Sequence, residues 1–262
     1  MAPEARIVVL DAQSGRMLAA GHLPEAARTL ANPGSALKPL LLYELVSAGR
    51  WDPSRRIACN RRLRIAGRSL NCSHPPAEPM NAEEALTWSC NTYFAAVAGT
   101  LRTDELRGLL AQTGLLGQTG LAPGEATAVF RDPHNIDEIR LALLGVEGVR
   151  VTPLEMAAAY RWLAAQLAAH PDSPASSVVR GGLADSASFG MGGAAALGGV
   201  PVAGKTGTAS LDLGGQTHGW FMGMAPAVAP SVVIAVYVPA GYGGDAARVA
   251  AELLAHSPLR QP

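Results

Sequence analysis

Lysine is nearly absent from this 262-residue chain: only Lys38 and Lys205 are lysines, and the other basic residues are arginines. Arginine supplies surface charge as well as lysine does, but it stays protonated in proteins. A site that needs an amine able to lose its proton therefore cannot use arginine. The two lysines are candidates for such a site, with survival by chance as the alternative.

An excess of charge of either sign is also lacking. The chain has 21 basic and 21 acidic residues, so its formal net charge is zero, and no run of five or more like charges occurs. A neutral chain has no electrostatic attraction for nucleic acid or for an anionic membrane, so neither is expected as a partner. The 48% of hydrophobic residues indicates a globular protein with a sizeable core.

Cysteine is scarce, with Cys59, Cys72 and Cys90 as the only examples. Three cysteines are too few for a disulfide scaffold, and no Cys/His spacing resembles a zinc site. We therefore expect no metal and no other cofactor. Cys59 and Cys72 flank residues 61–70, which we interpret as a short hairpin. A disulfide between them requires an exported protein and close Cα atoms, and the sequence leaves that question open.

We find no segment in the sequence that resembles a signal peptide or a membrane span. Residues 1–6 lead directly into a strand-like segment at residues 7–10. The longest stretch without formally charged residues, 213–244, contains Pro226 and Pro230. It is typical of two buried strands and not of about 20 continuous helical residues. The chain as written is predicted to be soluble.

The order of elements predicts an α+β protein in which both chain ends build one antiparallel sheet flanked by helices. We assign one domain over residues 1–262, with a sheet subdomain at about 1–50 and 178–262. An inserted all-helical subdomain is expected at about 80–170, and the cleft between such parts is a usual place for a site. Expected strands cover residues 7–10, 17–20, 200–208, 219–224 and 231–238; expected helices cover 36–46, 106–112, 136–144, 153–168 and 244–256; a Pro/Ser-rich connection covers 170–177.

Ser35 and Lys38 form a Ser-x-x-Lys pattern at the start of an apolar helix. Residues three apart on a helix share a face, so the amine is expected beside the hydroxyl. A partly desolvated lysine can take the proton of a serine, and a helix N-terminus supplies N–H groups near a developing oxyanion. The pattern indicates a serine nucleophile with a lysine base. The alternative is an N-cap serine followed by a surface lysine.

Two further patterns carry polar groups suited to the same chemistry. Ser89 and Asn91 form Ser-x-Asn in a predicted loop, after a helix start capped by Asn81 and Glu84. There Ser89 can relay a proton and Asn91 can hold a substrate amide, or both can be ordinary polar loop residues.

The third pattern is Lys-Thr-Gly-Thr at residues 205–208, on a predicted strand. Lys205 and Gly207 are expected on one face, and Thr206 and Thr208 on the other. Gly207 would let a substrate backbone approach closely, and the N–H of Thr208 would join that of Ser35 in an oxyanion hole. A plain strand with an exposed lysine is the alternative.

In this order and over this length, the three patterns resemble the penicillin-recognising serine enzymes, and specifically the transpeptidase domains of penicillin-binding proteins. The resemblance covers nearly the whole chain and implies a β-lactamase/transpeptidase-like fold. Further stretches that carry it are residues 9–15, 33–39, 85–94, 151–157, 203–209 and 220–226.

The resemblance implies that Ser35 is acylated by a D-Ala-D-Ala stem peptide, with Lys38 as general base. It implies that Ser89 and Asn91 assist proton transfer and orient the substrate. Lys205 and Thr206 would bind the substrate carboxylate. An amine of a second stem peptide would then attack the acyl-enzyme and complete a cross-link.

The resemblance implies that the rest of the third motif binds substrate. Thr206 would bind the substrate carboxylate together with Lys205, Gly207 would leave room for the substrate backbone, and Thr208 would hydrogen-bond the acyl donor. The implied setting is peptidoglycan biosynthesis in the periplasm or at the outer face of the cytoplasmic membrane. The implied partners are stem peptides, β-lactam antibiotics and a cell-wall glycosyltransferase. A membrane would be reached only through an anchor that the chain does not contain.

The chain departs from the family pattern in two respects. Family members usually carry a membrane anchor and an N-terminal module, and relatives with a similar cysteine-bracketed hairpin tend to have a His-Gly pair where this chain has His74 and Pro75. The conformation of that hairpin segment is therefore open. His74 and His218 are expected to be satisfied or solvated side chains without a catalytic role.

Other functions are compatible with parts of the sequence. Residues 199–206 also match the phosphate-binding loop Gly-x-x-x-x-Gly-Lys-Thr, which requires a helix directly after it. A serine β-lactamase would need an additional deacylating base, for which no motif is visible. A D,D-carboxypeptidase differs only in using water as acceptor. A non-catalytic β-lactam sensor would stay acylated.

Overall fold

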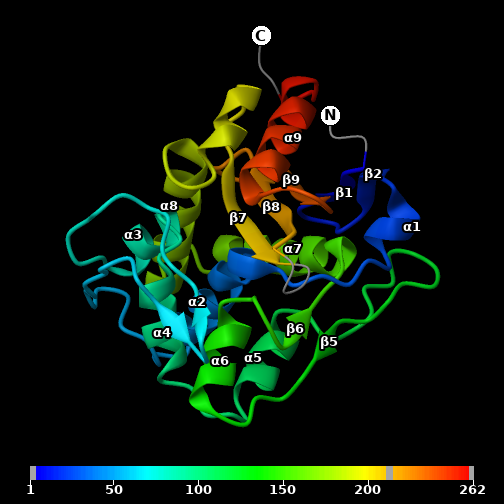
Figure 1. The fold of residues 1–262 in the computed structure, drawn as a ribbon. Helices are drawn as coiled ribbons and strands as arrows, with labels where there is room; N and C mark the ends of the chain where they lie inside the picture. The colour runs from blue at the N-terminus through cyan, green and yellow to red at the C-terminus, as the bar shows by residue number, and fades with distance from the viewer. Residues whose placement is uncertain (1–3, 211–214, 260–262) are drawn as a thin grey trace.

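One antiparallel sheet forms the centre of the protein, in a computed structural model that describes residues 4–210 and 215–259 (Figure 1). Its strand order is β2-β1-β9-β8-β7. The two ends of the chain meet in the middle of the sheet, where Val8 pairs with Ala235. The expectation of a sheet built from both chain ends is confirmed. Its strands are β1 (Arg6–Asp11), β2 (Met17–Gly21), β7 (Ala203–Ser210), β8 (Thr217–Ala225) and β9 (Val232–Val238).

Each face of this sheet covers a separate hydrophobic core, because successive side chains of a strand point to opposite faces. Ile234 and Val236 of β9 pack with helix α9 (Gly243–Ala255) on one face. Ala235 and Tyr237 belong to the larger core that includes helices α2 (Lys38–Ser47) and α7 (Pro153–Ala169). Figure 1 shows α9 and α7 on opposite sides of the sheet.

Helices fill the middle of the chain, and several begin at capping residues that can be read in the sequence. Asn81 and Glu84 form the predicted capping box, with Glu84 N donating to Asn81 Oδ1 over 3.0 Å and Asn81 N donating to Glu84 Oε2 over 2.8 Å. Thr152 and Glu155 form a second box at the start of α7. These boxes satisfy N–H groups that a helix start leaves without partners. The helices of this part are α3 (Ala82–Thr87), α4 (Asn91–Ala98), α5 (Leu106–Gln112) and α6 (Ile136–Leu143).

A long helix, α8 (Pro174–Ser188), starts inside the segment predicted as a connection. Ser173 is its N-cap, since its hydroxyl accepts from Ser176 N over 3.1 Å. Gly181 and Gly182 let α3 approach closely: an added Cβ on Gly182 would stand 2.8 Å from Leu86 Cβ. The prediction for residues 174–177 was wrong because proline and serine suit the first turn of a helix as well as a loop.

The remaining elements are short. Residues 61–70 contain the predicted hairpin, which joins β3 to β4. Across the described ranges 4–210 and 215–259, no helix has the length and hydrophobicity needed to cross a membrane. The short elements are α1 (Leu23–Ala26), the 3-10 helices η1 (Gly34–Leu37) and η2 (Gly193–Gly198), and strands β3 (Arg64–Ile65), β4 (Arg68–Ser69), β5 (Val129–Phe130) and β6 (Val149–Arg150).

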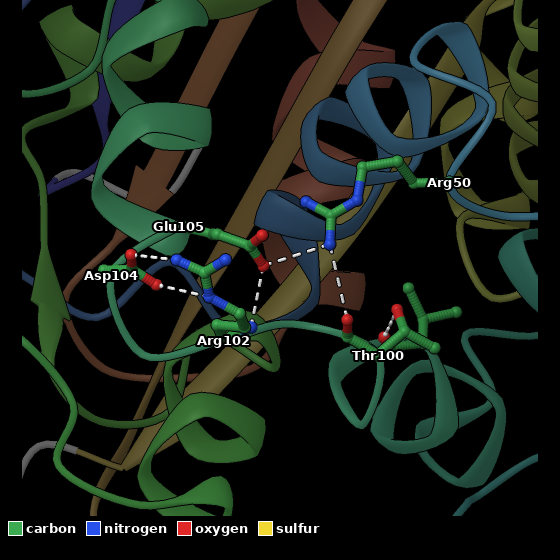
Figure 2. Close-up of polar contacts among 6 residues, drawn as sticks. Arg50, Thr100, Arg102, Asp104 and Glu105 are labelled. Atoms are coloured by element: carbon green, nitrogen blue, oxygen red, sulfur yellow. Dashed lines mark hydrogen bonds and ion pairs between the residues drawn. The ribbon is translucent and has the colours of Figure 1, made fainter.

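Polar side chains tie the end of α2 to the segment between α4 and α5 (Figure 2). Arg50, which follows α2, donates to Glu105 Oε2 over 3.0 Å and to Thr100 O over 3.4 Å. The same carboxylate accepts from the main-chain N–H of Arg102 over 2.7 Å. Glu105 therefore holds both the main chain at Arg102 and the side chain of Arg50 in place at the surface of the helical part.

Candidate active site

Ser35 lies in the 3-10 turn that leads into α2, so its position at a helix start is confirmed. The turn begins at Gly34, whose φ of 54° is a left-handed conformation that glycine adopts without strain. Gly34 N donates to Gly145 O over 2.8 Å, and the Tyr160 hydroxyl of α7 donates to Ala36 O over 2.7 Å. Main-chain atoms on both sides of Ser35 are thus held, while its side chain keeps partial exposure.

Lys38, which directly follows this turn in the chain, is fully buried. Its Nζ donates to Asn91 Oδ1 over 2.7 Å, to Ser89 O over 3.0 Å and to Ser89 Oγ over 3.4 Å. The ring of Phe94 lies 5.0 Å from the same atom. Burial lowers the pKa of Lys38 from 10.5 to about 8, so a neutral amine is accessible near physiological pH.

Ser89 and Asn91 come together with Lys38 at the turn between α3 and α4. Ser89 has a φ of 56°, Cys90 is the N-cap of α4, and Asn91 is the first helical residue. The prediction of a non-helical segment is therefore right for Ser89 and Cys90 but not for Asn91. The Asn91 side-chain amide also donates to Leu70 O over 3.0 Å, which connects this turn to the hairpin.

The third motif lies on β7, which packs against the Ser35 turn. Lys205 is fully buried, and its Nζ donates to Thr206 O over 3.2 Å. Burial, together with the nearby charge of Lys38, lowers the pKa of Lys205 well below its usual value. Two amines in one buried space cannot both be protonated easily, so one of them is driven toward the neutral form.

Gly207 faces the Ser35 turn and provides the room for it. A Cβ added at Gly207 would stand 3.0 Å from Ala36 N, and one added at Gly34 would stand 2.5 Å from Thr208 O. The sequence prediction gave this room to a substrate backbone. In the structure the protein's own main chain occupies it, so Gly207 serves the fit between β7 and the nucleophile turn.

Thr206 and Thr208 point to the other face of β7, as the alternation predicts. The Thr206 hydroxyl is 3.5 Å from Met191 O, and Gly243 N donates to Thr208 Oγ1 over 3.0 Å. Thr206 is buried, whereas Thr208 is exposed at the surface. Of the two hydroxyls, that of Thr208 is therefore the more accessible to a bound molecule.

His218 is buried and contacts the main chain just before Ser35, which sequence reasoning did not identify. Its Nε2 lies 2.7 Å from Asn32 O, and Trp220 Nε1 donates to the same oxygen over 2.9 Å. A carbonyl can only accept, so Nε2 carries the proton. Burial lowers the pKa of His218, which keeps the ring neutral in this supporting role.

Comparison with known sequences decides the family of this arrangement. A sequence model described as the penicillin binding protein transpeptidase domain matches residues 5–256. The chain belongs to the penicillin-binding protein transpeptidase domain family.

Solved structures with this transpeptidase fold agree closely in shape despite low identity. A peptidoglycan glycosyltransferase from Burkholderia ambifaria superposes with a TM-score of 0.81 at 22% identity, covering 96% of this chain and 87% of that one. The transpeptidase domain of Burkholderia pseudomallei penicillin-binding protein 3 gives 0.79 at 23% identity, with 98% and 90% covered. Pseudomonas aeruginosa PBP2, in complex with WCK 5153, gives 0.80 at 19% identity, with 96% and 72% covered. These likenesses confirm the predicted α+β fold.

The same fold decides against the phosphate-binding loop. Lys205 and Thr206 lie inside β7, which continues as a strand to Ser210. A phosphate loop needs a helix N-terminus directly after its Lys-Thr pair, and the described residues that follow Thr206 provide none. The Lys205 amine of this transpeptidase domain is instead buried, close enough to Lys38 for the charge of Lys38 to lower its pKa.

The three cysteines lie closer together in space than their spacing in the sequence indicates. All three are free thiols, so the structure contains no disulfide between Cys59 and Cys72. One ligand atom each from Cys59, Cys72, His74 and Cys90 lie within 4.8 Å of one another, beside the Ser89–Asn91 turn of the transpeptidase site. Sequence spacing did not reveal this group, because its members come from three separate segments that only the fold brings together.

Proposed function

We propose that the D,D-transpeptidase activity of this domain proceeds through an acyl-enzyme on Ser35. The observation that carries the proposal is the surroundings of Lys38, a fully buried amine whose Nζ donates to neutral oxygens of Ser89 and Asn91. Such an amine loses its proton far more easily than a solvated lysine does. It can therefore serve as the base for a serine in the preceding turn.

In the acylation step, neutral Lys38 takes the proton of the Ser35 hydroxyl while Oγ attacks the carbonyl carbon of the penultimate D-alanine. The N–H groups of Ser35 and Thr208 stabilise the oxyanion of the tetrahedral intermediate. The C–N bond then breaks, and the leaving D-alanine takes the proton back from Lys38 by way of Ser89. Lys205 and Thr206 bind the carboxylate of the departing residue, and Thr208, the exposed threonine of the motif, hydrogen-bonds the acyl donor.

In the second step, the amine of another stem peptide attacks the ester carbonyl and loses a proton to Lys38. The bond between the carbonyl carbon and Ser35 Oγ breaks, Oγ takes the proton back from Lys38 to restore the hydroxyl, and the new amide cross-link leaves. Asn91 orients the donor peptide in both steps. A β-lactam enters the same first step, but its leaving amine stays attached by the opened ring, so the ester persists.

We further propose an extracytoplasmic location, where stem peptides are cross-linked, and a cell-wall glycosyltransferase as a partner. The family membership supports both proposals.

The deciding experiment is time-resolved intact mass spectrometry of the protein with benzylpenicillin. We expect a persistent adduct of one penicillin per chain, absent from Ser35→Ala and present in the control Ser177→Ala, which alters an exposed serine of α8. A transient adduct with accumulating hydrolysed drug would indicate a β-lactamase. No adduct at any concentration would overturn the proposal.

A peptide assay separates the remaining acceptors. With a D-Ala-D-Ala donor and an amine acceptor, a transpeptidase forms the new amide, whereas a D,D-carboxypeptidase releases D-alanine to water regardless of the acceptor. A β-lactam sensor would be acylated by the drug and would turn over neither substrate.

A further inference from the structure

Three sulfur atoms and one imidazole lie within 4.8 Å of one another beside the catalytic turn. Cys59 Sγ lies 3.6 Å from Cys72 Sγ, and Cys72 Sγ lies 3.9 Å from Cys90 Sγ. In a tetrahedral zinc site with Zn–S bonds of about 2.3 Å, neighbouring sulfurs stand about 3.8 Å apart. The observed separations match that edge and are far longer than a disulfide bond of about 2.05 Å.

His74 provides an independent observation that points to a ligand. The residue is 1% exposed, and its Nδ1 lies 2.6 Å from Pro75 O. The carbonyl can only accept, so Nδ1 carries the proton and Nε2 holds a free lone pair. Nε2 is buried and has no hydrogen-bond partner among the described residues. A buried acceptor without a donor is costly, and metal-binding histidines commonly donate their other N–H to a backbone carbonyl in this way.

Backbone amides point at the sulfur atoms as well. Asn91 N donates to Cys72 Sγ over 3.1 Å, and Arg61 N donates to Cys59 Sγ over 3.3 Å. Such donors stabilise negative charge on sulfur, which is the form that binds a metal. Arg61 adds a cation nearby, since its guanidinium donates to His74 O over 3.1 Å.

We propose that Cys59, Cys72, His74 and Cys90 bind one Zn²⁺ ion in a tetrahedral Cys₃His site. The three thiols lose their protons to solvent on binding, and the neutral His74 binds through Nε2, so no redox change occurs. A thiolate-rich tetrahedral set favours Zn²⁺ among the common divalent ions. Four protein ligands leave no open position for water or substrate, so the ion is structural and takes no part in the chemistry.

The ion would fasten the irregular hairpin segment to the transpeptidase motif. Cys59, Cys72 and His74 come from the segment around β3 and β4, whereas Cys90 stands between Ser89 and Asn91. Asn91 already contacts this segment through Leu70 O. Zinc is therefore a positioning group for Ser89 and Asn91, the two residues that hold the Lys38 amine.

The metal test begins with the full chain, treated with chelator and reductant and then incubated with zinc chloride. After removal of excess ion, we expect about one zinc per chain by elemental mass spectrometry, as a closed four-ligand site predicts. X-ray absorption should give a shell of three sulfurs and one nitrogen. Cobalt exchanged into the wild-type protein should show the absorption bands of a tetrahedral thiolate site, which tests the ligands without any substitution.

Variants test the individual ligands. His74→Gln and Cys59→Ser should each lower zinc content to below roughly a third of the wild-type value and lower the melting temperature by roughly 5 °C or more, since structural zinc contributes directly to folding. The matched control His170→Gln alters an exposed histidine after α7 and should keep full zinc content. If either ligand variant fails to fold, the cobalt spectrum of the wild type still decides.

Two outcomes would overturn the proposal. One is a reduced protein with three reactive thiols that retains no zinc after incubation. The other is a mass lower by two hydrogens under native conditions, which means a disulfide. Because Ser35 is not a ligand, Ser35→Ala should bind zinc like the wild type, so failure of the acyl-enzyme proposal leaves this test unaffected. If zinc positions the motif, its removal should slow penicillin acylation of wild-type protein, with reversal on adding zinc back.

Discussion

The lysines and the arginines of this protein place the same charge in opposite surroundings. Lys38 and Lys205 are fully buried, and within residues 4–210 and 215–259 neither forms an ion pair with a carboxylate. Arg107 lies at the surface and holds both oxygens of Asp132, at 2.8 and 2.7 Å. Arg50 likewise pairs with Glu105 at the edge of the helical part (Figure 2).

This difference in burial gives the lysines and the surface arginines different roles. A paired guanidinium at the surface keeps its charge and contributes little to stability, because water screens it. An amine buried among neutral oxygens is penalised for its charge, so it exchanges its proton near neutral pH. The absence of any other lysine from the chain makes the contrast visible in the sequence itself.

The largest effect on the acylation rate is expected when Lys38 is replaced by arginine, a cation that cannot lose its proton. Lys38→Arg should slow benzylpenicillin acylation by roughly 1,000-fold, within the range that general-base catalysis contributes. The reverse exchange at the surface, Arg50→Lys, should leave the acylation rate unchanged. Stopped-flow or quenched mass spectrometry measures both rates.

Arginine is also larger than lysine, so a slow Lys38→Arg variant could reflect size and not charge, and a second variant separates the two effects. Lys38→Met keeps a linear side chain and no proton to exchange, so it should fold and be equally slow. Thermal unfolding followed by circular dichroism checks the fold of each variant. Acylation of folded Lys38→Met at the wild-type rate would exclude Lys38 as the base.

A smaller, graded effect is expected from pH. Burial lowers the pKa of Lys38 to about 8. The acylation rate should therefore rise about tenfold per pH unit below that value and level off above it, as the neutral amine becomes the main form. A rate that is flat from pH 6 to pH 9 would contradict the assignment.

The contribution of Lys38 to the free energy of unfolding should also rise with pH. In the unfolded chain Lys38 keeps its proton up to about pH 10.5, whereas in the folded protein it loses the proton near 8. The unfolded state binds more protons between these values, so the contribution of this group to stability rises with pH across that window. Denaturant unfolding of wild type and Lys38→Met at pH 7.5 and 10 isolates the contribution.

The smallest effect is expected at the surface. Arg50→Ala removes the partly exposed pair with Glu105 and should lower the free energy of unfolding by less than about 1 kcal/mol, an effect that salt weakens. Urea unfolding at low and high salt measures it. The control Arg62→Ala alters an exposed arginine that forms no ion pair with a described residue. An equal loss in both variants would show that the pair itself contributes nothing.

Local patterns made most of the fold predictable. The strands at residues 7–10 and 231–238 and the capping box at Asn81 and Glu84 depend on neighbours in the sequence, so alternation and capping rules find them. Helix α8 was predicted in part as a connection because the proline and serines of its first turn also suit a loop, and only the close contact of Gly181 and Gly182 with α3 shows where the helix packs. Packing between distant elements is not written in a local pattern.

The site divides in the same way. Ser35 and Lys38 are found from a spacing of one helical turn, and the buried state of Lys38 follows from the apolar helix that carries it. The roles of Gly207, His218 and the Cys/His group depend on which segment lies opposite each residue. No single spacing rule encodes those contacts, because each depends on how separate segments fold against one another.

The pairing of β1 with β9 has a consequence for the order in which the protein can form. Strand β1 precedes the other strands of this domain, whereas one of its two neighbours in the sheet, β9, is the last of them. Contacts between such distant segments make folding slow, and until β9 arrives one edge of β1 can pair with other chains. The Ser35 turn is supported by β7 and β8, which also come late. Labelling by a fluorescent penicillin should therefore report completed synthesis and folding, and truncated chains should stay unlabelled.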